Sequence, residues 1–169
     1  MICQLLNAKP RSKMAGFDFD YTLFRPKYNN YCFQSVDDWE LCHPTIKQKL
    51  ENTYVNGYMI VVFANMMIES WGIQMIQKAL TSLCLPLFIV YANRTLLTKP
   101  NANLYIHFQQ YIDEVHNIPN FQINRKSSFY IGDAMGRAED WFDYDKRFAE
   151  TIGIYYFTEN QFHYSIDIL

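Results

Sequence analysis

The chain has 169 residues, of which half are hydrophobic and 17 % are aromatic. This length and composition predict one folded domain over residues 1–169 and exclude a disordered chain. The formal net charge of -2 excludes a surface that is basic overall, so a nucleic-acid ligand would need a local basic patch.

The cysteines and the apolar segments indicate the compartment. The four cysteines form no CxxC pair, and no histidine cluster completes a zinc site. Reduced thiols are typical of intracellular proteins. The N-terminal segment lacks the order of a signal peptide, because its charges follow a short apolar run, and no apolar stretch approaches the ~20 residues of a membrane span. We therefore expect a soluble protein of the cytoplasm or nucleus that is neither secreted nor bound to a membrane.

The first predicted strand covers 14–17, and Asp18, Asp20 and Thr22 follow it at alternate positions. Two aspartates one residue apart, at the end of a strand and beside a turn, can form a cation site. One carboxylate can bind Mg²⁺ and act as a nucleophile, while the second is placed to protonate a leaving group. A short acidic motif also occurs as the polar end of an ordinary strand. The catalytic interpretation therefore depends on whether other polar residues of the chain lie near the same strand end.

Two segments lie outside the regular alternation of strands and helices. Residues 1–13 form a predicted arm with basic residues at 9, 11 and 13, which either contact phosphates or belong to a frayed terminus. Residues from about 21 to 42 form a predicted insertion, or flap, that contains Tyr28, Tyr31, Phe33 and Trp39. Two interpretations of these rings stay open: they stack on nucleic-acid bases, or they form a hydrophobic cluster beneath the insertion.

The rest of the chain alternates helices and strands. Helices are predicted from about 43 to 56, around 73–83 and at 103–116, where apolar residues recur at helical spacing. Strands are predicted at 58–63, 87–91, 129–131 and 154–157, where short apolar runs suit strands buried on both faces. Together with the first strand, this order predicts an α/β, Rossmann-like fold, with a central parallel sheet of about five strands flanked by helices.

Polar side chains follow four of the five predicted strands. They are Asp18, Asp20, Asn65, Arg94, Lys99 and Asp133. Ligands of such folds bind at the carboxyl ends of the parallel strands, so these residues from separate parts of the chain are expected to converge at one edge of the sheet. Isolated polar strand ends would not explain all of these placements together.

Several segments resemble the haloacid-dehalogenase phosphatases and, more narrowly, the 3′-phosphatase domains of polynucleotide kinase phosphatases. These segments are DFDYT at 18–22, Lys99-Pro100, YIGDAMGR at 130–137, DKRFA at 145–149 and GIYYFTENQF at 153–162. The resemblance covers nearly everything from 15 to 162. It implies the haloacid-dehalogenase fold, Mg²⁺ as cofactor and catalysis through an aspartyl-phosphate.

The resemblance also implies a role for each matching residue. Asp18 would be the nucleophile, and Asp20 would protonate the leaving oxygen and then activate water. Lys99 would neutralise the phosphate charge and steady the nucleophile. Mg²⁺ would be held by Asp18, the backbone of Asp20, and Asp133.

Further matching positions would serve the substrate or support the metal. Thr22 would help to fix the loop, and we include it with Asn65 and Arg94 among the expected substrate-binding residues. Arg137 would either meet a nucleic-acid phosphate or brace the loop of Asp133. The family has an acidic residue at the position of Asp145, and this residue would support the metal. Most of the acidic run at 140, 143 and 145 is expected on a solvated face.

The chain departs from the family pattern near the phosphate site. Ala64 stands where family members carry Thr or Ser, whose hydroxyl binds the transferring phosphoryl group, and Met66 replaces a glutamine. Losing one such hydrogen bond is expected to slow catalysis by about 10²–10³-fold, by analogy with an oxyanion donor. Thr98 replaces an arginine, for which Arg94 can substitute, and Tyr21 replaces a glycine.

The main expectation is a Mg²⁺-dependent phosphomonoesterase that removes 3′-phosphate from DNA or RNA ends. One alternative is the same chemistry on a small phosphorylated metabolite, nucleotide or phosphoprotein, and another is a weakened pseudophosphatase that only binds. The insertions are short, which suits an open site for a polymer end. No GxxxxGK[ST] motif occurs, so we expect a stand-alone phosphatase. The high content of Asn, Tyr, Phe and Ile is typical of an A/T-rich genome and compatible with a viral source.

Overall fold

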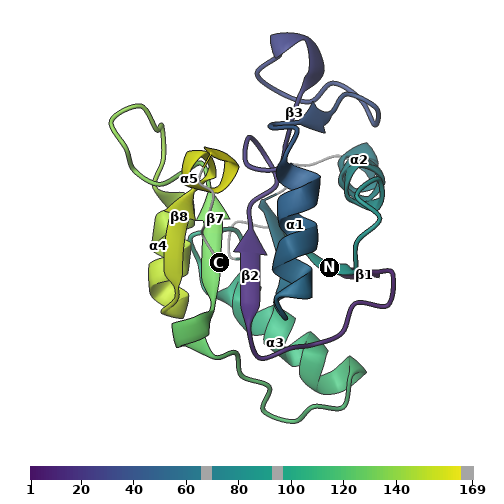
Figure 1. The fold of residues 1–169 in the computed structure, drawn as a ribbon, viewed down its shortest axis with the longest axis vertical. Coiled ribbons are helices and arrows are strands. Elements are labelled where there is room, and N and C mark those ends of the chain that lie inside the picture. The colour runs from purple at the N-terminus through teal and green to yellow at the C-terminus, as the bar shows by residue number, and fades with distance from the viewer. Residues whose placement is uncertain (66–69, 93–96, 165–169) are drawn as a thin grey trace.

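A six-stranded sheet with the order β1-β6-β5-β2-β7-β8 forms the centre of the computed structural model (Figure 1), which describes residues 1–65, 70–92 and 97–164. Its strands are β1 (Ile2–Leu5), β2 (Met14–Phe17), β5 (Met59–Asn65), β6 (Leu87–Ala92), β7 (Phe129–Gly132) and β8 (Tyr155–Thr158). All neighbouring pairs are parallel except β1 and β6. The predicted α/β architecture is confirmed, with six strands in place of about five.

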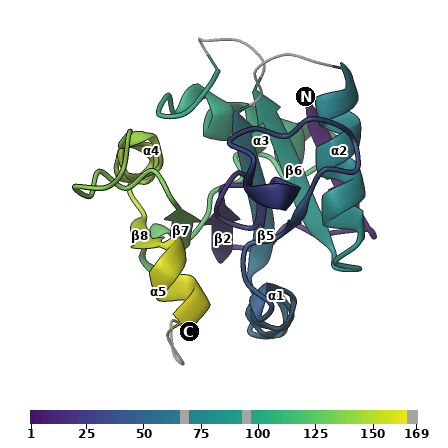
Figure 2. The same cartoon turned by 90° about the horizontal axis from the view of Figure 1, so that it is seen from above.

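Helices cover both faces of this sheet (Figures 1 and 2). Helices α1 (Ile46–Val55), α2 (Ser70–Thr81) and α5 (Glu159–Tyr164) pack into one hydrophobic core, and α3 (Asn103–Val115) and α4 (Tyr144–Ile152) pack into the other. Alternate side chains of the central strands enter the two cores, as Val62 and Val61 of β5 do. Burial on both faces explains the continuous apolar runs of these strands. Among the helices of the described ranges, none has the length and apolar character needed to cross a membrane.

The N-terminal segment is part of the fold, which corrects the expectation of a free basic arm. Strand β1 pairs antiparallel with β6, from Ile2 opposite Val90 to Leu5 opposite Leu87. Arg11 donates hydrogen bonds to the carbonyls of Tyr54 and Tyr58, and Lys13 and Asn56 are joined in the same way. These cations bind carbonyl groups at and just beyond the C-terminal end of α1, where the helix dipole favours positive charge. They therefore lie at the amino ends of the strands, away from the predicted site.

The flap is the predicted small insertion, built on β3 (Phe24–Arg25), the 3₁₀ turn η1 (Lys27–Asn29) and β4 (Glu40–Leu41). Two of its rings point inward. Phe33 lies 5.8 Å from Phe19, and Trp39 lies 5.6 Å from Phe24, between ring centroids. Two tyrosines, at 28 and 31, stay exposed. The cluster interpretation thus describes the first two rings, and the second two remain open to a ligand.

Candidate active site

A buried ion pair joins the ends of two strands at the predicted edge of the sheet. Asp18 follows β2 directly, and its backbone N–H donates to the carbonyl of Ile131 in β7 at 2.9 Å. Lys99 reaches Asp18 from the segment after β6, with 2.5 Å between Nζ and Oδ1. Both residues are buried. The structure therefore brings the predicted nucleophile and its predicted cation together, while their catalytic roles stay predictions.

Asp145 and Tyr130 complete the surroundings of Lys99. Lys99 Nζ lies 2.7 Å from Asp145 Oδ1 and 2.9 Å from the hydroxyl of Tyr130, which in turn donates to Asp145 Oδ1 at 3.0 Å. Asp145 is only 1 % exposed, so it is not part of the solvated face expected for most of the acidic run, and its burial fits its expected place beside the metal site. Sequence reasoning missed Tyr130, whose spacing in a buried strand gives no sign that its hydroxyl faces a lysine.

Three carboxylates of this site are close enough to share one cation. Asp18, Asp133 and Asp145 each offer an oxygen within 4.8 Å of the others. A donor set made only of carboxylate oxygens suits the hard Mg²⁺ ion. Asp20 also lies in this electrostatic environment. Lys99 therefore supplies a single positive charge to several carboxylates. A divalent cation would balance the excess of negative charge, so the residues present fit the predicted cofactor.

The acidity of these carboxyl groups reflects the same imbalance. Burial raises the pKa of Asp18 well above its usual range, although Lys99 opposes the shift. Burial, followed by the charge of Asp145, raises the pKa of Asp133 to about 7. Asp20 has an exposed side chain, yet desolvation by the protein around it raises its pKa to about 6, again against Lys99. An acid in this range can hold a proton near neutral pH, as a group that protonates a leaving oxygen must.

Gly132 leaves room for the Asp145 carboxylate. A Cβ atom at this position would lie 2.3 Å from Asp145 Oδ2, so a side chain cannot fit unless the carboxylate moves. We expect Gly132→Ala to weaken Mg²⁺ binding by about tenfold or more, a loss of the size seen when groups around a metal are disturbed. Isothermal titration calorimetry with Mg²⁺ measures this. A folded variant that binds Mg²⁺ as the wild type does would show that Asp145 is not part of the metal site.

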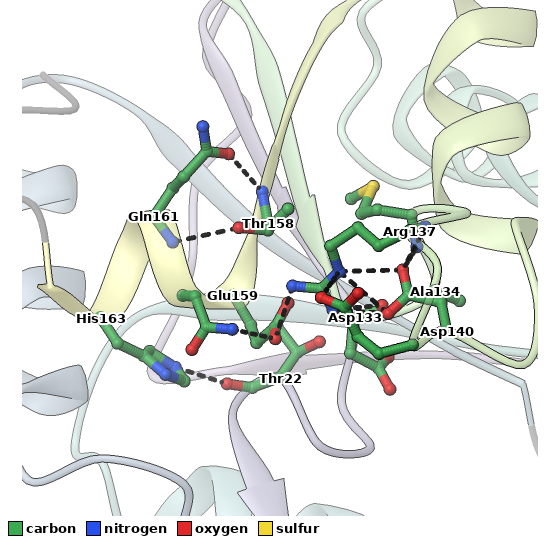
Figure 3. A network of polar contacts seen from close by, with 12 residues as sticks. Thr22, Asp133, Ala134, Arg137, Asp140, Thr158, Glu159, Gln161 and His163 are labelled. Atoms are coloured by element: carbon green, nitrogen blue, oxygen red, sulfur yellow. Dashed lines mark hydrogen bonds and ion pairs between the residues drawn. The ribbon is translucent and has the colours of Figure 1, made fainter.

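Arg137 braces the loop that carries Asp133 (Figure 3). Its Nη2 donates to the backbone carbonyl of Asp133 at 3.0 Å, its Nε to Asp140 Oδ1 at 2.9 Å, and its Nη1 to Glu159 Oε1 at 3.0 Å. All three nitrogens of the guanidinium are thus engaged inside the protein. Of the two expectations for Arg137, the brace matches these contacts, and the contact with a nucleic-acid phosphate stays a prediction.

Helix α5 ties this brace to the loop of the predicted nucleophile. Glu159 is the first residue of α5, and His163 lies one turn later on the same helix (Figure 3). His163 Nε2 lies 2.9 Å from the carbonyl oxygen of Thr22. A carbonyl only accepts hydrogen bonds, so Nε2 carries the proton in this contact. Helix α5 therefore holds both loops of the site, one through Arg137 and the other directly.

Removal of the Arg137 guanidinium tests the brace. In Arg137→Gln the carbonyl of Asp133 loses the hydrogen bond from the guanidinium and keeps only that from the backbone of Met135, and Glu159 loses its ion pair with Arg137. We expect the affinity for Mg²⁺ to fall by about 10- to 100-fold, because the loop of Asp133 is no longer held in place. The matched control is Arg147→Gln on α4, where an exposed arginine pairs only loosely with Asp143 at 3.7 Å. Equal Mg²⁺ affinity in the two variants would contradict the brace.

The remaining predicted substrate residues occupy different kinds of position. Thr22 is fully buried, which suits a residue that fixes the loop and excludes direct contact with a substrate in this conformation. The Asn65 amide forms two hydrogen bonds with the backbone of Lys99: it accepts from the N–H at 2.7 Å and donates to the carbonyl at 3.1 Å. Asn65 therefore positions Lys99, and its contact with substrate stays a prediction. Arg94 lies outside the described residues. Ala64 is buried near the end of β5.

Comparisons with known proteins identify relatives of this chain. The chain is 32 % identical over 163 residues to the bifunctional polynucleotide phosphatase/kinase of Schizosaccharomyces pombe, covering 91 % of this chain and 38 % of that protein. It is 26 % identical over 172 residues to a polynucleotide 3′-phosphatase of Arabidopsis thaliana, covering 89 % of this chain and 24 % of that one. The chain thus spans less than half the length of these two relatives.

In a viral relative and in one solved structure, the match covers a larger share of the other protein's own length. An uncharacterized 20.8 kDa protein of Autographa californica nuclear polyhedrosis virus is 29 % identical over 168 residues, which are 90 % of this chain and 86 % of that protein. The crystal structure of an uncharacterized protein from Listeria monocytogenes has a TM-score of 0.59 at 14 % identity and covers 86 % of this chain and 77 % of its own. This second likeness supports the fold alone.

The family model described as polynucleotide kinase 3 phosphatase matches residues 13–163. This range includes every residue of the site described above, from Asp18 to His163. The resemblance noted in the sequence to the haloacid-dehalogenase phosphatases and to this narrower group is confirmed. The chain belongs to the polynucleotide kinase 3 phosphatase family.

Proposed function

We propose that this chain is a Mg²⁺-dependent phosphomonoesterase that acts inside the cell and removes 3′-phosphate groups from DNA or RNA ends. The observation that carries the proposal is the buried Asp18–Lys99 pair beside the carboxylates of Asp133 and Asp145. This arrangement supplies a nucleophile, a compensating cation and oxygen ligands for a metal. The family and the polynucleotide 3′-phosphatase among the relatives support the choice of substrate.

The chemistry follows from the positions of two aspartates. A carboxylate oxygen of Asp18 forms a bond to phosphorus as the bond to the ribose 3′ oxygen breaks, and that oxygen takes a proton from Asp20. Water then attacks the phosphorus of the aspartyl-phosphate and gives its proton to Asp20, which releases inorganic phosphate and restores Asp18. Mg²⁺ held by Asp18, Asp133 and Asp145 would supply positive charge beside the phosphoryl oxygens. Lys99 is fixed against the nucleophile and steadies its orientation.

Phosphate release from defined substrates tests this function. The protein is incubated with Mg²⁺ and a 3′-phosphorylated oligonucleotide, a 5′-phosphorylated oligonucleotide or p-nitrophenyl phosphate, each with an EDTA control. We expect Mg²⁺-dependent release from the 3′ end and none from the 5′ end. Release from p-nitrophenyl phosphate alone would keep the chemistry and move the substrate to small molecules.

A binding protein without turnover is the second candidate, and Ala64 favours it. The methyl group of Ala64 cannot offer the hydrogen bond that a Thr or Ser hydroxyl gives at this position in the family. A folded protein that releases phosphate from none of the three substrates, yet binds Mg²⁺ in calorimetry, would support this candidate over the enzyme.

A further inference from the structure

We propose that Tyr28 and Tyr31 of the flap stack on the bases of a single-stranded nucleic acid whose 3′ end lies at Asp18. This inference rests on the proposed function and narrows its substrate to ends with unpaired bases. The two side chains are 89 % and 85 % exposed. Solvent-facing aromatic rings are the usual platform for unpaired bases, because every base has a flat π face.

The flap holds these two rings on an ordered support. Asp38 is buried and accepts hydrogen bonds from the backbone N–H groups of Lys27 and Gln34 at 2.9 and 2.8 Å. These two bonds close the segment that carries both tyrosines. An ion pair between Asp37 and Lys78 also ties the flap to α2. A platform that is ordered before binding loses less conformational freedom when a base stacks on it.

Tyr21 places this platform next to the catalytic loop. Its hydroxyl lies 2.8 Å from the carbonyl oxygen of Tyr31 and 3.2 Å from that of Asn30. Because Tyr21 follows Asp20 directly, the flap backbone lies within one tyrosine side chain of the proposed acid. Seen from the carboxyl ends of the strands, the flap extends over β5 and β6 beside the end of β2 (Figure 2). The nucleotides next to a phosphate at Asp18 are therefore within reach of the two rings.

The backbone at Tyr21 and Tyr28 adopts a conformation that is uncommon for tyrosine. Both residues have left-handed φ angles, of 55° and 59°, a region that bulky side chains rarely adopt. At Tyr21, where the family has glycine, the tyrosine accepts this conformation and gains the hydroxyl contact with the flap. At Tyr28 the same conformation accompanies a ring that is almost fully in solvent. Strained conformations of this kind often accompany ligand contacts.

Kinetics of the alanine variants test the proposal. In Tyr28→Ala, Tyr31→Ala and the double variant, we expect the KM for a single-stranded 3′-phosphorylated oligonucleotide to rise by about 5- to 150-fold per tyrosine, the usual range for a lost stacking contact. Hydrolysis of p-nitrophenyl phosphate should stay unchanged, because it needs only the site at Asp18. Tyr155→Ala is the matched control, since this tyrosine is 63 % exposed at the amino end of β8.

Two outcomes of these kinetic experiments would overturn the inference. The first is a double variant that processes the oligonucleotide as the wild type does. The second is an equal loss on a blunt duplex with a 3′-phosphate, whose bases cannot stack on the flap. If the wild type hydrolyses p-nitrophenyl phosphate and no oligonucleotide, the proposed function fails separately. Fluorescence anisotropy with a 3′-hydroxyl oligonucleotide then decides: weaker binding by the double variant supports stacking, and equal or absent binding overturns it.

Discussion

Replacing Asp18 by asparagine is expected to abolish phosphate release, by about 10⁴-fold or more, while the protein stays folded. The asparagine amide cannot attack phosphorus, and removal of a nucleophile is among the largest effects that one substitution produces. The fold should tolerate the change, because Asn has nearly the same shape and Lys99 keeps its contacts with Asp145 and Tyr130. Initial rates on the 3′-phosphorylated oligonucleotide and on p-nitrophenyl phosphate, together with thermal melting, measure the result.

Asp113→Asn is the matched control for this experiment. Asp113 lies on α3, and its carboxylate accepts a hydrogen bond from the backbone of Phe121 at 2.8 Å, a bond that the amide oxygen of asparagine can also accept. We expect wild-type rates from this control. Residual turnover above about 1 % in Asp18→Asn would mean that another group attacks phosphorus, which would refute the aspartyl-phosphate mechanism.

The strands that carry the site were predictable because each combines an apolar run with a polar end. Strands β2, β5, β6 and β7 all have this form, and their observed bounds agree with the predicted ones to within two residues. Strand β1 was missed because its sequence, Ile2–Leu5, is short and half-buried throughout. Nothing in those four residues indicates the antiparallel pairing with β6, which depends on residues far along the chain.

The site was predictable only as far as its residues follow strands or match a motif. Asp18, Lys99 and Asp133 do both. Asp145 lies in an acidic stretch whose charge pattern indicates exposure, and its burial is set by Lys99, which is 46 residues away in sequence. A hydroxyl such as that of Tyr130 faces the ammonium only because of the register of β7 with β2, where Gly16 opposite Tyr130 leaves room for the ring. Such contacts between distant segments cannot be read from local spacing.

Lys99→Met is expected to destabilise the protein by about 3–5 kcal/mol without Mg²⁺, and added Mg²⁺ should restore part of this loss. Methionine keeps the volume of the lysine stem, but Asp18 and Asp145 lose the ammonium that compensates two buried carboxylates. A cation bound to the same carboxylates stabilises the folded state, by an amount that rises with the logarithm of its concentration divided by its Kd. Thermal melts in EDTA and in Mg²⁺ measure both effects, and the gain from Mg²⁺ should be larger in the variant than in the wild type.

The double variant Lys99→Met with Asp145→Asn separates charge from packing. If the loss comes from an uncompensated carboxylate, removing one of the two carboxylates together with the ammonium should recover stability relative to Lys99→Met alone, and the two changes will not be additive. Additive losses would mean that Lys99 stabilises the fold through packing. In that case the Asp18–Lys99–Asp145 cluster would not be the electrostatic unit on which the proposed metal site and nucleophile depend.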